Sequence, residues 1–344
     1  MPHRRTFQTI ALAGVVAAAL GFSACSNPNE PVQQPPAPSI TCPANITTRG
    51  VSGSGQPVTY PPATVSGGAS PVTTTCTPAS GSSFNVGTTA VSCTAADAAS
   101  RQAQCSFTVT LTPMIVSVTK YLAFGDSLTE GQNGRAGLHG ERIVDVPNAY
   151  PTKLQSMLNA EYPGQGITVP NYGYGGLPVG DEANDKLQDA LVKEKPGAVL
   201  LLDGYNNLFS VCAPGVSNTQ RCSDSITAVT FGIRDLIRIA KRPEYGVRYI
   251  FVSTMTPPGP YLNIPPDRRI ANDAIVRANT GIVNMVRSEA VTLVDTYPRF
   301  IGHEAEYVDQ DGLHLRPAGY QALADSFFGV IKTTVTTTPG FRSN

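Results

Sequence analysis

Residues 120–131 read KYLAFGDSLTEG, an apolar run that ends in a tight polar turn. Similar apolar runs follow at 167–171, 198–202, 248–253 and 291–294, and helix-like segments lie at 150–160, 181–193, 223–242, 267–288 and 317–332. Strands that alternate with helices at this spacing predict a parallel sheet with helices on both faces. Pro170 suits an edge strand, because proline cannot donate to a central ladder. We therefore expect an α/β domain over residues 116–335.

The turn Gly125-Asp126-Ser127-Leu128 places a serine directly after the first predicted strand. Open α/β sheets bind their ligands at the carboxyl ends of the strands, where the strand order reverses. The turn is not the GxSxG elbow of α/β-hydrolases. Taken alone it is weak evidence, so Ser127 becomes a candidate nucleophile only if other residues supply a base and oxyanion donors.

A candidate base lies far along the chain, in Asp311-Gly312-Leu313-His314. A carboxylate and an imidazole three residues apart can share one turn. His314 can then act as general base toward Ser127, with Asp311 orienting the ring. The alternative is a plain surface turn before a helix, and Pro317 does mark a helix start.

Donors for an oxyanion are available in loops that follow the first three predicted strands. A tetrahedral intermediate needs hydrogen-bond donors aimed at its negatively charged oxygen. The Ser127 backbone N–H is one candidate. Residues 171–176 read NYGYGG and offer a glycine N–H, and residues 204–207 read GYNN and offer an asparagine amide. Each loop alone is more often an ordinary turn, but all blocks together are hard to explain structurally.

These blocks, in this order, resemble the SGNH (GDSL) hydrolase family. The resemblance implies Ser127 as nucleophile, with His314 and Asp311 completing a catalytic triad. It implies Ser127, Gly176 and Asn206 as the oxyanion hole. It also implies a three-layer, flavodoxin-like domain with a five-stranded parallel sheet in the order 2-1-3-4-5, and no metal or cofactor.

One position departs from the family pattern, since Asn207 stands where an aspartate usually follows the oxyanion asparagine. We expect this change to affect local loop support more than catalysis. The resemblance implies a serine esterase that hydrolyses carboxylic esters of small molecules or polymers. The absence of tryptophan and of a long apolar lid favours acetyl or short acyl chains. Two alternatives stay open, namely a binding protein on an inactive hydrolase scaffold and an acyltransferase.

Residues 40–113 have a different composition, rich in Thr, Ser, Val and Gly. Short alternating runs separated by turn clusters predict a small β-sandwich. The stretches CPANI at 42–46, SGSSFNVGTT at 80–89, VSCTAAD at 91–97 and CSFTV at 105–109 resemble a hyalin repeat (HYR) module, an immunoglobulin-like sandwich associated with adhesion. We expect disulfides Cys42–Cys105 and Cys76–Cys93, although four cysteines permit three pairings. The module is either a spacer or a binding domain for a polysaccharide or surface partner.

The N-terminus has the features of an export signal. Two arginines precede an apolar run at 10–21, so we expect residues 1–24 to be a signal peptide. Phe22-Ser23-Ala24-Cys25 resembles a bacterial lipobox, which implies lipidation of Cys25; the alternative is an ordinary signal peptide that contains a cysteine. Residues 25–39 then form a lipidated, Pro-rich tether. We expect an exported lipoprotein of the bacterial cell envelope, held at a membrane by its lipid anchor only.

The number of cysteines agrees with export of the protein. Of seven cysteines, six remain after Cys25, an even number that predicts disulfides in an exported chain. The third expected pair is Cys212–Cys222, which we predict stiffens the rim of the cleft.

The 25 basic and 25 acidic residues give a net charge of zero, which argues against a nucleic-acid partner. Residues 336–344 are expected to be a frayed tail.

Overall fold

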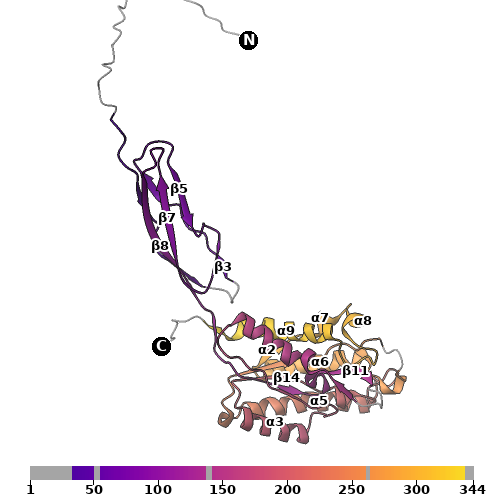
Figure 1. Ribbon diagram of the computed structural model, residues 1–344. Helices are drawn as coiled ribbons and strands as arrows, with labels where there is room; N and C mark the ends of the chain where they lie inside the picture. Colours follow the sequence, from indigo (N-terminus) through magenta and orange to yellow (C-terminus); the bar gives the residue numbers. More distant parts are fainter. Residues whose placement is uncertain (1–32, 50–54, 137–141, 261–263, 338–344) are drawn as a thin grey trace, which may run out of the picture.

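The computed structural model describes residues 33–49, 55–136, 142–260 and 264–337. The expected signal peptide at 1–24, the expected lipidation site Cys25 and the tether up to residue 32 lie outside the described residues. An elongated β-sandwich is followed along the chain by a larger α/β domain (Figure 1).

The sandwich consists of three small sheets. The largest has the strand order β2-β8-β7-β5, and the pairs β1-β4 and β3-β6 complete it. Buried and exposed residues alternate along β7 and β8, as in strands that cover a core with one face. That core contains Tyr60, Phe84, Phe107 and Leu111. The strands are β1 (Ser39–Thr41), β2 (Ile46–Arg49), β3 (Gln56–Pro57), β4 (Thr64–Ser66), β5 (Thr73–Thr77), β6 (Ser83–Phe84), β7 (Gly87–Ala96) and β8 (Gln102–Thr112).

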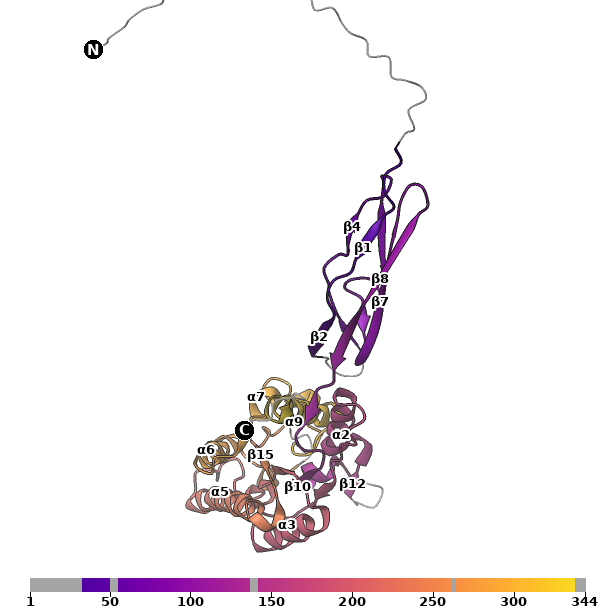
Figure 2. The same ribbon diagram turned by 90° about the vertical axis from the view of Figure 1, so that its left-hand side faces the viewer.

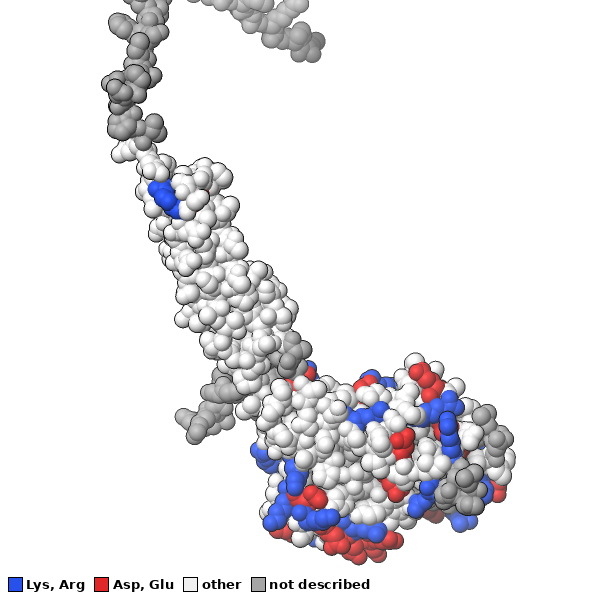
Figure 3. Space-filling model, viewed as in Figure 1, with Lys and Arg blue, Asp and Glu red and all other residues white. Residues whose placement is uncertain are grey.

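Two disulfides fasten the sandwich, and they are the two expected pairs, Cys42–Cys105 and Cys76–Cys93. The second joins residues that lie directly opposite each other in the β5–β7 ladder. On the face seen in Figure 3 the sandwich is almost free of charged side chains, whereas the α/β domain carries many of both signs. The disulfides supplement a core too small to stabilise a module of this size strongly.

The α/β domain is built on a five-stranded parallel sheet in the order β13-β10-β14-β15-β16. Numbered within the domain this is 2-1-3-4-5, the flavodoxin-like order that the family resemblance implied. Residues of β10 and β14 are buried throughout, as expected for central strands covered on both faces. The strands are β10 (Tyr121–Gly125), β13 (Asn171–Gly173), β14 (Ala198–Leu202), β15 (Tyr249–Ser253) and β16 (Thr292–Val294).

Helices cover both faces of the sheet. Helices α2 and α9 lie together on one face, and α3, α5 and α6 lie on the other (Figure 2). No helix in the described ranges combines the length and the apolar character needed to cross a membrane. The helices are α1 (Ser127–Glu130), α2 (Tyr150–Glu161), α3 (Asp181–Glu194), α4 (Tyr205–Leu208), α5 (Gln220–Ala240), α6 (Asn272–Ser288), α7 (Tyr297–Phe300), α8 (Glu304–Tyr307) and α9 (Pro317–Val335), with single 3-10 turns η1 (Val146–Asn148), η2 (Pro243–Tyr245) and η3 (Pro266–Arg268).

The second strand of the sheet lies later in the chain than predicted. Its ladder covers β13, whereas the sequence predicted 167–171. The preceding segment still runs beside β10, because the carbonyl groups of Thr168 and Pro170 accept hydrogen bonds from the N–H groups of Tyr121 and Ala123. Pro170 has no N–H to return, so a regular ladder begins only after it. The strand does lie at the sheet edge, as predicted.

The first two residues of the tail expected at 336–344 form a strand instead. Residues Thr336–Thr337 form β17 and pair with β9 (Ile115–Val116), the strand that enters the domain. Pairing of the two short strands satisfies backbone groups that a frayed end would leave to water. Residues 338–344 lie outside the described residues.

Candidate active site

Ser127 lies at the carboxyl end of the central strand β10, as the first residue of the short helix α1. Gly125 makes the turn possible, because a Cβ at this position would lie 1.9 Å from the carbonyl oxygen of Leu202. The Asp126 side chain caps α1 by accepting a 3.0 Å hydrogen bond from the N–H of Leu128. Ser127 is only 4% exposed, so its hydroxyl is fixed in a cavity wall rather than free in water.

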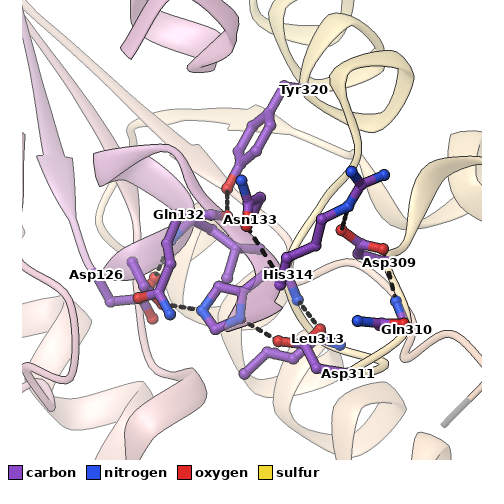
Figure 4. Close-up of polar contacts among 12 residues, drawn as sticks. Asp126, Gln132, Asn133, Asp309, Gln310, Asp311, Leu313, His314 and Tyr320 are labelled. Carbon is purple, nitrogen blue, oxygen red and sulfur yellow. Dashed lines mark hydrogen bonds and ion pairs between the residues drawn. The ribbon is translucent and has the colours of Figure 1, made fainter. Parts of the chain in front are cut away.

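His314 and Asp311 share one turn just before α9, as the sequence predicted. His314 Nε2 lies 2.9 Å from Ser127 Oγ, and His314 Nδ1 lies 2.5 Å from Asp311 Oδ2. Figure 4 shows Asp311 at one edge of the imidazole ring. A serine, a histidine and a carboxylate in this linear arrangement can pass a proton from the serine oxygen to the imidazole.

The turn that carries His314 is held on several sides. Asp311 Oδ1 accepts hydrogen bonds from the N–H groups of Leu313 and His314. The loop after β15 supports the turn through the N–H of Gly259, which donates to the carbonyl of Gly312. Burial alone would raise the pKa of Asp311, but the hydrogen bond and charge of His314, with the two N–H groups, hold it below its ordinary value. Asp311 is therefore ionised at neutral pH.

The three residues expected to supply oxyanion donors, Ser127, Gly176 and Asn206, line the same cavity. Within the described residues, the backbone N–H groups of Ser127 and Gly176 are not engaged in hydrogen bonds. Gly176 has a φ of +86°, a conformation that glycine adopts without strain. The side-chain Nδ2 of Asn206 donates one hydrogen bond to the carbonyl of Leu177, which leaves its second N–H for a ligand. Such an arrangement can stabilise a developing oxyanion.

Asn207, the departure from the family pattern, faces the oxyanion loop and not the serine. Its Oδ1 accepts from the N–H of Val179, and its Nδ2 donates to the carbonyl of the same residue. An aspartate here would keep the first contact and set a carboxylate oxygen against a carbonyl. The amide therefore suits this loop, in line with the expectation that the change concerns loop support.

The site residues line one cavity of about 480 Å³. All five that the sequence singled out, Ser127, Gly176, Asn206, Asp311 and His314, contribute to its wall. Sequence reasoning missed the other lining residues, which are Gln132, Arg142, Phe209, Ile264, Arg268 and Leu313. Two of these, Gln132 and Arg142, come from the paired strands β11 (Gln132–Ala136) and β12 (Arg142–Val144). No local motif signals them, because only the folded chain brings them to the cavity.

The third expected disulfide, Cys212–Cys222, is present beside the cavity. Cys212 lies in the segment after α4, three residues beyond the cavity-lining Phe209, and Cys222 lies in the first turn of α5. The carbonyl of Cys212 also accepts a hydrogen bond from the N–H of Ala271, which precedes α6. Both contacts restrict the cavity wall that contains Phe209.

Comparison with known proteins identifies the relatives of each region. The profile of the GDSL-like lipase/acylhydrolase family matches residues 123–322, and that of the HYR domain matches residues 33–111. No curated protein matches the chain. An acetylxylan esterase from Geobacillus stearothermophilus is 21% identical, with 66% of this chain and 97% of that chain covered and a TM-score of 0.46. A lipase/acylhydrolase from Enterococcus faecalis is 18% identical, with 63% and 96% covered and a TM-score of 0.48.

Proposed function

The chain belongs to the GDSL-like lipase/acylhydrolase family and is a carboxylic ester hydrolase, and we propose that Ser127, His314 and Asp311 are its catalytic triad. The observation that carries the proposal is the continuous hydrogen-bonded line from Ser127 Oγ through the His314 ring to Asp311, at 2.9 and 2.5 Å. A binding protein on an inactive scaffold would need neither these distances nor the N–H groups of Ser127 and Gly176, which have no hydrogen-bond partner among the described residues.

The proposed reaction has two halves. Ser127 Oγ attacks the ester carbonyl carbon while His314 Nε2 takes the hydroxyl proton, and Asp311 stabilises the imidazolium. The resulting oxyanion accepts hydrogen bonds from the N–H groups of Ser127 and Gly176 and from the Asn206 amide. The C–O bond to the alcohol then breaks, and the alcohol leaves with the proton from His314. In the second half, water, activated by His314, attacks the acyl-enzyme and releases the acid.

The cavity supports a preference for short acyl chains. Its apolar lining within the described residues comes from Phe209, Ile264 and Leu313, while Gln132 and two arginines are polar. An acetyl or butyryl group fits against this small apolar surface, whereas a long chain would extend over polar groups or into water. We propose an acetyl or short-chain ester, carried by a small molecule or a polymer.

We propose further that the protein is exported and held at a membrane through Cys25. Three disulfides support an oxidising compartment, since cytosolic proteins seldom keep them. Along the chain the HYR module, residues 33–111, lies between Cys25 and the hydrolase domain. We propose that this module is a spacer between anchor and enzyme; binding of a polysaccharide or surface partner is the second reading.

Hydrolysis of p-nitrophenyl acetate, butyrate and octanoate by residues 26–344 tests the proposed specificity. We expect kcat/KM for acetate or butyrate to exceed that for octanoate by about tenfold or more, because the longer chain would extend over the polar groups of the cavity lining. Equal or higher rates for octanoate would contradict the short-chain proposal. Transfer of the acyl group to an added alcohol, with little free acid formed, would identify an acyltransferase instead.

A further inference from the structure

Two buried carboxyl groups follow neighbouring strands of the sheet, and one of them directly precedes Ser127. Asp126 directly follows β10 and Asp203 directly follows β14. In the parallel ladder Gly125 is the partner of Leu202, so the next residues along, Asp126 and Asp203, are neighbours at the sheet edge. Asp126 is completely buried and Asp203 is 2% exposed. Asp126 precedes the proposed nucleophile, and Asp203 lies in the loop that leads to Asn206.

In each of the two carboxyl groups only one oxygen, Oδ1, accepts a hydrogen bond. Asp126 Oδ1 accepts a hydrogen bond from the N–H of Leu128, and Asp203 Oδ1 accepts one from the N–H of Gly204 at 2.6 Å. Among the described residues, neither Oδ2 atom has a hydrogen-bond partner. A buried ionised oxygen without a donor is costly, and two neighbouring buried negative charges are costlier still.

The surroundings favour retention of a proton. Burial raises the pKa of Asp126 to about 6, against the lowering effects of the backbone N–H groups of Leu128, Tyr205 and Asp126 itself and of His314. Burial, and then the negative charge of Asp126, raise the pKa of Asp203 well above its ordinary value. Other titratable side chains influenced by Asp126 come from the packed helices α2, α4 and α9, and they are Tyr150, Tyr205 and Tyr320. These phenols remain neutral near pH 7.

We propose that Asp126 and Asp203 share a single proton between their Oδ2 atoms, and that this hydrogen bond fixes the nucleophile loop against the oxyanion loop. One proton gives both unpartnered oxygens a partner and leaves the pair with a single negative charge. The bond links the backbone just before Ser127 to the backbone three residues before Asn206. Asp203 is in this sense a positioning residue, and this role rests on the proposed function of Ser127 and Asn206.

Substitution of Asp203 separates a shared proton from simple filling of space. In Asp203→Asn the amide can donate to Asp126 Oδ2 while its carbonyl oxygen still accepts from Gly204, so the link survives without a titrating proton. We expect its kcat to remain within about threefold of the native value. In Asp203→Ala the link is lost, and we expect kcat to fall by roughly 10- to 100-fold with KM within about twofold. Asp97→Asn, a change of a buried aspartate in the sandwich, serves as the matched control and leaves kcat unaltered.

The pH dependence of the melting temperature tests the proton itself. Because the native pair holds a proton that the unfolded chain releases above about pH 4, its contribution to stability falls as pH rises through the native pKa range. Between pH 5 and 7 we expect the native Tm to fall by roughly 5 °C more than that of Asp203→Asn. The proposal is overturned if Asp203→Asn keeps the native slope, or if it loses as much kcat as Asp203→Ala. The melting experiment needs no substrate, so it tests the shared proton even if ester hydrolysis proves not to depend on Ser127.

Discussion

Replacement of Ser127 with alanine should lower kcat for p-nitrophenyl acetate by about 10⁴-fold or more. Ser127 Oγ is the oxygen 2.9 Å from His314 Nε2, and its removal leaves no nucleophile for an acyl-enzyme. The remaining rate comes from water that reaches a site with its oxyanion donors intact. Steady-state rates at saturating substrate measure this effect.

The loss should occur without a loss of stability. The Ser127 hydroxyl makes its hydrogen bond to His314 and the residue is 4% exposed, so alanine leaves neither a large cavity nor a broken backbone contact. We expect the Tm of Ser127→Ala to lie within about 2 °C of the native value. Retention of more than a tenth of the native kcat would show that another residue is the nucleophile.

Replacement of Asp311 with asparagine should lower kcat by about 10³- to 10⁴-fold. The asparagine Oδ1 can still accept from the N–H groups of Leu313 and His314, so the turn persists. Its amide nitrogen would replace the oxygen that lies 2.5 Å from His314 Nδ1 and would donate where a carboxylate accepts. The imidazole proton is then forced onto Nε2, which can no longer take the proton of Ser127.

A second histidine–carboxylate pair supplies a matched control for this substitution. His303 Nδ1 lies 3.2 Å from Glu306 Oε2, with the same three-residue spacing but on the exposed surface. Glu306→Gln should leave kcat unchanged within error. If Asp311→Asn retained more than a tenth of native kcat, the carboxylate would not be needed to orient His314.

Much of the site could be predicted because its residues lie in short motifs at strand ends. The alternation of apolar runs with helix-like segments predicted the parallel sheet, and the carboxyl ends of parallel strands meet at one edge. The turns around Ser127 and Asn206 therefore come together once the strand order is known, whereas His314 lies in a turn just before α9 that only its own motif identified. Each of these motifs is local, and a local pattern is readable in one sequence.

The features that escaped prediction depend on contacts between distant segments. Arg142 reaches the cavity only because β12 pairs with β11, and the intervening pattern gives no strand signal. The apolar pattern predicted a strand over 167–171, but the β13 ladder begins after Pro170 because proline has no N–H to donate to β10. Asp203 ends an apolar run and reads as the start of a turn, although burial beside Asp126 makes it part of the site's support.

The most direct test of the account is covalent labelling by diisopropyl fluorophosphate, followed by intact-mass analysis and peptide mapping. A serine activated by a neighbouring imidazole displaces fluoride and keeps the diisopropylphosphoryl group. We predict one adduct per chain, located on Ser127, absent in Ser127→Ala and formed much more slowly in His314→Ala. An adduct on another residue, or ester hydrolysis by an enzyme that is never labelled at Ser127, would contradict the account.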